Sequence, residues 1–347
     1  MFEIENTLSF NTDKIIDGTE YDYVTRTSLN QGILCTTGFV NSENINPAGT
    51  WSLGLLQMDF FYREKQWYAG QFVRKIIPKI EINKASRLFF STILNKQKQR
   101  LLSVLVRDVD KIFRDTKIKL PTKCGQIDFD FMTSFVAELE ARRVAELESY
   151  LLATGLKDYI LTAQEEKALN DFNSLEWKVF NLEKLFGKAT RGKRLKSDDR
   201  VIGTLPFVTA GEADEGISAF IGNKVEIFES NTTTIDMFGS AKYRNYRYGA
   251  DDHVAVVHTE TLPIKAAIFV TSAIHKAAHT GEFNYGRNFY AKDADALNVK
   301  LPAKGGVPDY EFMKNYISAI QKLVIKDVVL YADSKIEATK SIVKTSK

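Results

Sequence analysis

The sequence is poor in the residues from which most catalytic and metal sites are built. Its 347 residues include only 2 cysteines and 4 histidines. Cys35 and Cys124 give neither a disulfide framework nor metal-ligand spacing, so two reduced thiols are expected. All four histidines lie within residues 253–279. His275 and His279 could share one helix face, but no third ligand stands out, and we predict no bound metal.

Long hydrophobic runs and a targeting segment are also missing. No apolar stretch approaches the roughly 18 residues that a membrane-spanning helix needs. The first residues, Met1–Glu5, are acidic and lack the apolar core of a signal peptide. The net charge is only +3, so any basic surface must be local, while 44% hydrophobic residues can bury two cores. These features predict a soluble cytoplasmic protein.

Catalytic motifs are absent or broken. Gly187–Lys193 has the spacing of a phosphate-binding loop, but Arg194 stands where serine or threonine should hold magnesium. Pro308 and Asp309 lack the Glu-x-Lys partner of a nuclease. Asn46–Gly49 is not the Asn-Pro-Pro-aromatic motif of amino-methyltransferases. We therefore predict that the chain is not an enzyme by itself and carries no cofactor.

The chain repeats itself instead. The loop that opens with Leu120 and Pro121 returns at Leu301, an offset of 301 − 120 = 181 residues, and Asp128–Met132 returns as Asp309–Met313 at the same offset. Upstream, Lys84-Ala85 matches Lys265-Ala266, Tyr62-Arg63 matches Tyr243-Arg244, and Tyr23-Val24-Thr25 matches Phe207-Val208-Thr209 at an offset of 184. Ordered matches of this length predict a duplicated domain.

Local patterns give a coarse reading of the elements. We predict a strand over 21–27, a turn over 28–32, a loop over 41–50, a strand-like stretch over 67–77 broken by Gly70, a helix-rich region over 82–113, and further helix over 156–186. The most regular prediction is an amphipathic helix over about 128–153 that ends near Gly155. Its 26 residues would span roughly 39 Å.

Each copy thus ends in a helix with an apolar stripe. The stripes share helical spacing, and we predict that they form a coiled-coil-like seam between helices or with partner helices: Met132, Phe135, Leu139, Leu147, Met313, Ile317, Ile320 and Val324. The predicted fold class is α+β, with two similar mixed α/β domains in a pseudo-twofold arrangement separated by long antiparallel helices. A glutamate-rich helix solvated on its own remains the alternative.

Basic and aromatic residues point to binding. Lys184–Lys196 carries six basic residues and no acid, which suits phosphate contacts; a solvated interdomain linker is the alternative. Tyr and Trp alternate with Arg and Lys in 61–68 and again in 242–248, for which an exposed hairpin edge is the alternative. Arg and Lys contact phosphates or guanine, and Asn and Gln contact adenine. One turn of B-DNA, about 34–36 Å, is close to the length of the predicted helix.

This arrangement resembles the specificity subunits of restriction–modification systems, type I and the related type IIB. The resemblance is carried by the order domain, helix, domain, helix, by the openings Tyr23–Thr27 and Leu205–Thr209, and by the closings that begin at Leu120 and Leu301. Cys124 departs from the pattern, because the second copy has Gly305 there.

The resemblance implies that each domain is a target recognition domain that binds one half of a split, asymmetric DNA target. It also implies that the helices dock methyltransferase subunits, two for each chain, or fused methyltransferase–nuclease subunits. Those subunits would carry S-adenosylmethionine and Mg²⁺ and methylate adenine. The domain boundaries predicted on this basis are 1–127 and 188–309 for recognition, 128–187 for the central helical spacer, and 310–347 for the C-terminal helix.

Residue type and loop position select the candidate DNA contacts: Thr25, Arg26, Asn30, Gln31, Tyr62, Arg63, Lys65, Lys188, Arg191, Lys193, Arg194, Thr209, Tyr243, Arg244, Tyr246 and Arg247. Two other functions stay open at this point. One is a scaffold or decoy that binds methyltransferase subunits without reading DNA. The other is a stand-alone regulator with duplicated DNA-binding domains.

Overall fold

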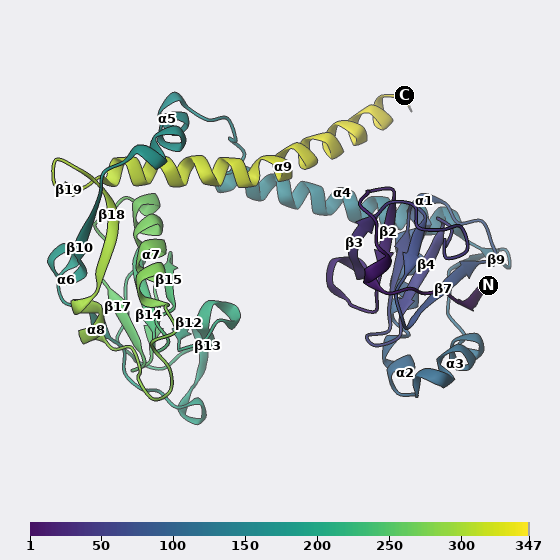
Figure 1. Cartoon of the computed structure of the whole chain (residues 1–347), viewed down its shortest axis with the longest axis horizontal. Helices are drawn as coiled ribbons and strands as arrows, with labels where there is room; N and C mark the ends of the chain where they lie inside the picture. Colours follow the sequence, from purple (N-terminus) through teal and green to yellow (C-terminus); the bar gives the residue numbers. More distant parts are fainter. Residues whose placement is uncertain (346–347) are drawn as a thin grey trace. The chain divides into compact units, whose positions relative to one another are not determined.

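The computed structural model describes residues 1–345, with side chains described for residues 1–338. It consists of two compact units (Figure 1), one formed by residues 1–146 with the end of the last helix and the other by Leu147–Glu337. Each unit combines sheets and helices, which confirms the predicted fold class. Within the described residues, no helix combines the length and apolar character needed to cross a lipid bilayer.

The first unit is built on two sheets. One has the strand order β1-β7-β4-β5 and the other β3-β2-β6. Trp51, Phe60 and Ile76 from the larger sheet pack with Phe90 and Leu94 into its core. The elements are β1 (Phe2–Asn6), β2 (Tyr21–Val24), η2 (Leu29–Gly32), β3 (Ile33–Thr37), β4 (Thr50–Gly54), β5 (Asp59–Arg63), β6 (Trp67–Ala69), β7 (Val73–Pro78), α1 (Lys84–Asn95), α2 (Lys98–Leu102), α3 (Val109–Asp115), β8 (Thr122–Lys123) and β9 (Gln126–Ile127).

The second unit repeats this plan. Its sheets have the orders β11-β17-β14-β15 and β13-β12-β16, and a third sheet, β10-β18-β19, is added. Helix α7 lies along the β14–β15–β17 sheet (Figure 1) and buries Phe269, Val270 and Ile274 against it. The elements are α5 (Ala163–Asp171), β10 (Trp177–Asn181), α6 (Leu182–Phe186), β11 (Thr190–Arg191), β12 (Ile202–Val208), η6 (Ala213–Gly216), β13 (Ile217–Ile221), β14 (Thr232–Asp236), β15 (Ala241–Arg244), β16 (Gly249–Ala250), β17 (Val254–Val257), α7 (Ile264–Ala278), α8 (Ala291–Ala296), β18 (Asn298–Lys304) and β19 (Val307–Pro308).

Strand pairing confirms the duplication. β2 pairs antiparallel with β3 and parallel with β6, and β12 pairs in the same two ways with β13 and β16. β4 lies between β5 and β7, as β14 lies between β15 and β17. The equivalent elements follow one another in the same order along the chain, which is the relation that the repeated sequence predicted.

The prediction of further helix over 156–186 is confirmed for α5 and α6 and is wrong before α5 and at β10. Residues 177–181 form β10, which pairs antiparallel with β18, with Trp177 opposite Pro302 and Asn181 opposite Asn298. The segment Trp-Lys-Val-Phe has the aromatic and β-branched composition that suits a strand. Its partner lies about 120 residues further along the chain, and this strand pairing overrides the helical pattern.

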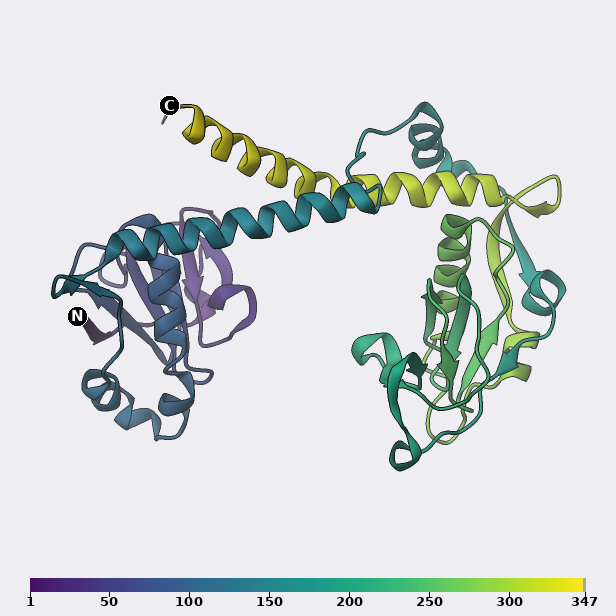
Figure 2. The same cartoon turned by 180° about the vertical axis from the view of Figure 1, so that it is seen from behind.

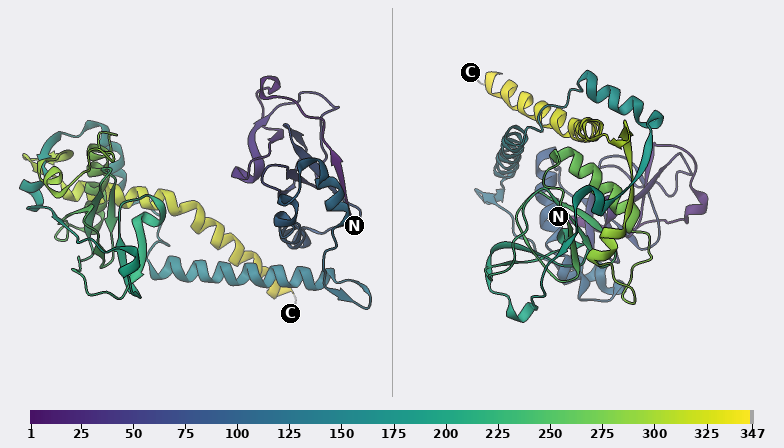
Figure 3. Two further views of the ribbon diagram at one scale, coloured as in Figure 1. Left: turned by 90° about the horizontal axis from the view of Figure 1, so that it is seen from below. Right: turned by 90° about the vertical axis from the view of Figure 1, so that its left-hand side faces the viewer.

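Each domain closes with a hairpin that leads into a long helix (Figure 3). Helix α4 covers Phe129–Ala153, 25 residues, and confirms the predicted central helix, while α9 covers Tyr310–Thr345. Asp128 caps α4 by accepting a hydrogen bond from the Phe131 amide, and Asp309 caps α9 in the same way. Residues 346–347 of the predicted C-terminal helix lie outside the described residues.

The helices meet within the second unit, and their seam differs from the predicted one. Leu151 at the end of α4 packs against Val329 and Ala332 of α9, with Leu147 beside them; the two helices run in opposite directions there (Figure 2). Met132 and Met313 instead lie in the two domain cores. Helical spacing could not separate these roles, because a core-facing stripe has the same period as a seam.

The other predicted seam residues fall in three environments. Ile317 packs at the edge of the second core, and Ile320 is half-buried on the same helix. Val324 is exposed. Phe135 and Leu139 are exposed on the first unit.

One buried carboxylate fastens α5 to α9. Glu165 accepts hydrogen bonds from Ser318 Oγ and the Thr162 amide, and pairs with Lys322 Nζ at 3.1 Å. Burial alone would raise the pKa of Glu165, but these hydrogen bonds outweigh it and lower the pKa to about 2.

Substituting Glu165→Gln tests this attachment. Since the folded pKa lies below the value of about 4.3 in an unfolded chain, ionised Glu165 stabilises the fold above about pH 4.5, and this stabilisation is lost as the pH falls toward 2. We expect the variant to lose on the order of 3 kcal/mol of unfolding free energy at pH 7 and to converge with the parent near pH 2. Urea titrations at several pH values measure this. Glu166→Gln, at the exposed neighbouring position, should change little; an equal effect of both substitutions would contradict the assignment.

Candidate functional site

Both units contain the same unusual turn in the same place. In η2, Asn30 and Gln31 have φ values of +45° and +54°, and in η6, Asp214 and Glu215 have φ values of +48° and +55°. Side-chain-bearing residues rarely occupy this left-handed region, at a cost of about 1–3 kcal/mol each, and such strain concentrates at functional sites. All four side chains are exposed. We call η2 and η6 the left-handed turns.

A glycine and a backbone bond close each left-handed turn. Gly32 and Gly216 both have φ of +80°. The Thr25 amide donates to the Gly32 carbonyl at 2.8 Å, and the Thr209 amide donates to the Gly216 carbonyl at 2.8 Å. At Gly216, an added Cβ would stand 2.8 Å from the Thr209 carbonyl oxygen, so no larger residue fits without a shift. The turns therefore share one backbone design.

A buried arginine lies beneath each left-handed turn. Arg63 is 2% exposed and Arg244 is 1% exposed. Arg63 Nε donates to Ser52 Oγ at 2.9 Å, and its terminal nitrogen donates to the Gln31 carbonyl. Arg244 Nε donates in the same way to Thr234 Oγ1 at 2.9 Å. Burial lowers the pKa of Arg63 to about 10.

The burial of these two arginines corrects their predicted role as DNA contacts. Arg63 and Arg244 were expected to reach DNA, but their guanidinium groups lie inside the domains. Arg63 donates to the Gln31 carbonyl of its turn, whereas Arg244 lies next to Gly216 and donates to Thr234. Arg244 also donates to the Tyr246 hydroxyl at 2.9 Å, so Tyr246 belongs to the same arrangement. Both arginines face inward because of their place in the pleat of β5 and β15, which a run of alternating aromatic and basic residues does not reveal.

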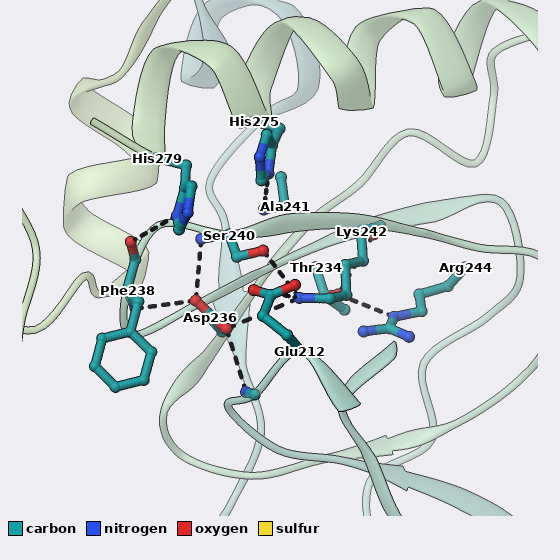
Figure 4. A network of polar contacts seen from close by, with 11 residues as sticks. Glu212, Thr234, Asp236, Phe238, Ser240, Ala241, Lys242, Arg244, His275 and His279 are labelled. Atoms are coloured by element: carbon teal, nitrogen blue, oxygen red, sulfur yellow. Dashed lines mark hydrogen bonds and ion pairs between the residues drawn. The ribbon is translucent and has the colours of Figure 1, made fainter. Parts of the chain in front are cut away.

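A polar bridge joins each left-handed turn to the adjacent hairpin. In the first unit, Ser28 Oγ donates to Asp59, which pairs with Lys98 Nζ at 2.6 Å. In the second unit, Lys242 Nζ bridges Glu212 at 3.2 Å and Asp236 at 3.9 Å (Figure 4). Hydrogen bonds from Ser240 and Lys242 lower the pKa of Glu212. Both units therefore have a polar bridge at this place, but different residues form it.

Asp236 anchors the second bridge to the backbone. It accepts hydrogen bonds from the amides of Phe238 and Ser240, and from Gly211 at the entry to the turn. His275 accepts from the Ala241 amide, and His279 lies against the Phe238 carbonyl (Figure 4). The two histidines with helical spacing thus fix the β14–β15 turn.

The predicted contacts around the first turn are spread over several surfaces. Arg26 is exposed and stacks over Phe72 at 5.3 Å, and Thr25 is half-buried at the base of the turn. Lys65 pairs with Asp22 at 2.9 Å. Tyr62 packs under Arg87 on the helix side of the sheet, 4.7 Å from the guanidinium carbon, away from the turn.

In the second unit, Tyr243 is likewise turned away, since its hydroxyl donates to Asn231 Oδ1 at 2.9 Å. Burial raises the pKa of Tyr243. Arg247 is exposed and pairs with Glu229 at 3.1 Å.

The basic segment Lys184–Lys196 is not a free linker, because it begins in α6 and its residues Thr190 and Arg191 form the edge strand β11. β11 pairs with β17, and the Lys193 amide donates to the Ala250 carbonyl at 3.0 Å. The Asp251 amide in turn donates to Val208, next to Thr209 at the base of the turn. Four side chains of the segment are exposed: Lys188, Arg191, Lys193 and Arg194. The structure therefore brings Lys193 and Thr209 to one end of the second domain.

Two candidate positions of the second turn were not predicted from the sequence. Asp214 and Glu215 occupy the places of Asn30 and Gln31, at the offset of 184 that also relates Gly32 to Gly216. The same offset, applied to the residues before the glycine, could have found them. We call the two left-handed residues of each turn its tip. The tip of the first turn carries two neutral amides, and the tip of the second carries two carboxylates.

Comparisons with known proteins agree with this architecture. Residues 1–149 match the family described as Type I restriction modification DNA specificity domain. The Type II restriction enzyme BgcI specificity subunit S.BcgI of Heyndrickxia coagulans is 24% identical over 273 residues, covering 76% of this chain and 75% of that protein. The crystal structure of a Type-I restriction-modification system S subunit from M. genitalium shares the fold, with a TM-score of 0.60 over 99% of this chain and 92% of that chain at 14% identity.

Residues 1–149 thus carry a restriction–modification DNA specificity domain. Over most of its length the chain is similar to specificity subunits of restriction–modification systems. The function that these similarities support is DNA sequence recognition as the specificity component of such a system.

Glycine substitutions test the strain in the turns. Gln31→Gly and Glu215→Gly each remove an L-residue from the left-handed region, so we expect each to raise the unfolding free energy by about 1 kcal/mol. Leu29→Gly, at the exposed turn residue outside the left-handed pair, should lower it by about 0.5–1 kcal/mol. Urea unfolding of the three variants measures this. Loss of stability in all three would show that the left-handed backbone is not strained.

Proposed function

We propose that the two domains read the two unlike halves of a split, asymmetric DNA target and direct partner adenine methyltransferase or restriction subunits to it. The observation that carries the proposal is the left-handed turn: one strained backbone, with a buried arginine beside it, occurs twice, with different side chains at the two exposed left-handed positions. Two related domains that bind different half-sites need the same backbone and different exposed side chains, and the two turns provide both.

The chemistry of each tip suits a different base pattern. The amides of Asn30 and Gln31 can donate and accept together, which matches adenine in the major groove. The carboxylates of Asp214 and Glu215 only accept, which matches an exocyclic amino group such as that of cytosine. Carboxylates are repelled by phosphates, so a DNA-facing acidic tip favours base edges over the backbone.

We propose separate roles for the remaining contacts. Arg191, Lys193 and Arg194, with Lys188, would neutralise phosphates beside the second half-site. Thr25, Thr209 and Arg26 stay in the proposed contact set as chain neighbours of the turns, and Lys65 and Arg247 stay in it as exposed basic residues. Arg63, Arg244, Tyr62, Tyr243 and Tyr246 become supporting residues. The domain boundaries 1–127 and 188–309, with 128–187 and 310–347 between and after them, remain part of the proposal.

The partners follow from the class of protein. The H. coagulans relative is named as the specificity subunit of a restriction enzyme. We propose that this chain likewise assembles with methyltransferase or fused methyltransferase–nuclease subunits, two per chain. S-adenosylmethionine and Mg²⁺ would be bound by those subunits.

Alanine substitution of the exposed turn residues tests whether each domain reads one half of the target. In a complex with the cognate methyltransferase, Asn30→Ala with Gln31→Ala should relax one half of the methylated sequence, and Asp214→Ala with Glu215→Ala only the other half. Each lost base contact is expected to cost about 1–3 kcal/mol of discrimination. Genome-wide mapping of methylated adenines measures this. Gln164→Ala with Asn170→Ala on α5 is the matched control. If either tip variant altered both halves, the modular reading would fail.

The basic edge has a distinct signature. Replacing Arg191, Lys193 and Arg194 with alanine should weaken binding to all DNA sequences alike and reduce the slope of log K against log salt by about 3, since each phosphate contact contributes about 0.9. Fluorescence anisotropy of the assembled complex at several salt concentrations measures the slope. Lys326→Ala, an exposed position on α9, should leave the slope unchanged. A triple variant that lost affinity for the target alone would argue for base contacts instead.

A further inference from the structure

Arg26 carries a positive charge at the first left-handed turn. It lies within the loop of residues 25–32, which the bond from the Thr25 amide to the Gly32 carbonyl closes. Its side chain is exposed and has no ion-pair partner among the described residues. The guanidinium carbon stands over the Phe72 ring instead, 5.3 Å from the centroid. A guanidinium group held over an aromatic face keeps its N–H donors available to a ligand.

Phe72 has an unusual backbone conformation. It follows Gln71 in the turn between β6 and β7, and its φ is +62°. Turns that need this left-handed value usually have glycine or asparagine there, and a bulky residue is an outlier. The Phe72 carbonyl accepts a hydrogen bond from the Leu55 amide at 2.9 Å, which helps to fix the conformation. The ring is 53% exposed, so burial in a core does not explain why phenylalanine occupies this position.

The second unit shows that the shared fold does not require this conformation. His253 occupies the place of Phe72 at the offset of 181, and its φ is not positive. Ala210 occupies the place of Arg26 at the offset of 184. The second domain therefore has neither member of the pair. Strain that one copy keeps and the other lacks indicates a function of that copy.

Backbone contacts fix the position from which the Arg26 side chain projects. The Gly70 amide donates to the Val24 carbonyl at 2.8 Å. Gly54 lies so close that an added Cβ would stand 2.9 Å from the Arg26 Cα. With the bond that closes the turn, these contacts hold Arg26 in place before any ligand binds. Such pre-organisation reduces the entropy that binding costs.

The pair suits a base edge better than a phosphate. Phosphate contacts carry no sequence information, so two related domains would need them alike. A contact that one domain has and the other replaces with alanine suits a residue that reads sequence. Arginine donates two hydrogen bonds to O6 and N7 of guanine in the major groove, and this contact depends on the orientation of the guanidinium group.

We propose that Arg26 reads a guanine in the half-site of the first domain and that Phe72 is the positioning residue that orients it. The inference rests on the proposed function and deepens it, because it takes this domain as a reader of DNA sequence. Phe72 itself needs no contact with DNA. The second domain, with Ala210 and His253 at these places, has no counterpart of the contact.

A guanine analogue tests the Arg26 contact in the complex with the cognate methyltransferase. Once methylation mapping has given the motif, each of its guanines is replaced in turn by 7-deazaguanine, which lacks the N7 acceptor. At one position the parent should lose about tenfold in affinity, measured by fluorescence anisotropy, whereas Arg26→Ala should bind both duplexes equally. The slope of log K against log salt should not change in this variant, since only a lost phosphate contact would reduce it, by about 0.9.

Phe72 variants test the positioning role. Phe72→Trp keeps an aromatic face under the guanidinium group and should respond to 7-deazaguanine as the parent does. Phe72→Asn removes the ring, and asparagine tolerates the left-handed backbone, so this variant should unfold at the parent's temperature and yet lose most of the response. Phe39→Leu is the control, because Phe39 is an exposed phenylalanine beyond the end of β3 that is far from the turn. It should respond as the parent does.

Three results would overturn the inference. One is that no 7-deazaguanine position distinguishes the parent from Arg26→Ala. Another is that Arg26→Ala weakens binding to all sequences alike and reduces the salt slope, and the third is that Phe72→Asn responds as the parent does. In each case a parent complex that methylates a split motif leaves the proposed function standing. A parent complex without any preferred motif would overturn the proposed function, and this inference with it.

Discussion

The arrangement depends on one interaction that occurs twice: a guanidinium group buried beneath a left-handed turn. Arg63 donates to Ser52 and to the carbonyl of Gln31, and Arg244 donates to Thr234. Burying a cation is costly unless its donors are satisfied. In the first unit the Ser52 hydroxyl and the Gln31 carbonyl supply acceptors, so Arg63 joins the sheet to the strained turn. In the second unit the hydroxyls of Thr234 and Tyr246 supply them.

A fixed frame leaves the tip free to change. The side chains of Asn30 and Gln31, or of Asp214 and Glu215, are exposed and support no core. Their substitution therefore alters the surface without altering the fold. The polar bridges show the same freedom, because Ser28, Asp59 and Lys98 serve in one unit and Glu212, Lys242 and Asp236 in the other. Such a design lets two copies of one domain acquire different specificities.

The two copies differ most in the segment that precedes the second domain, residues 172–191. The second unit gains β10 and its aromatic residues as a cover. Its edge strand β11 carries Arg191, whereas the equivalent edge strand β1 carries Glu3 and Glu5. Within the described residues the first unit has no such cover, and Leu88, at the place of Phe269, is exposed. The duplication thus produced two domains with the same sheets and turns. The segments next to each domain differ.

The sequence alone determined the duplication, the central helix, the mixed fold class and a turn over 28–32, because each of these is written in local pattern or in a fixed offset. The left-handed backbone of that turn, and its counterpart at Asp214 and Glu215, came from the structure. Tertiary structure decided the rest. An arginine beside a tyrosine looks the same on a surface as in a core, and only the pleat of β5 and β15 turned Arg63 and Arg244 inward. Met132 and Met313 have the spacing of a helix–helix seam, but both side chains pack into the domain cores. β10 needed β18, a strand far away in the chain, because strand pairing is a long-range interaction that no local window contains.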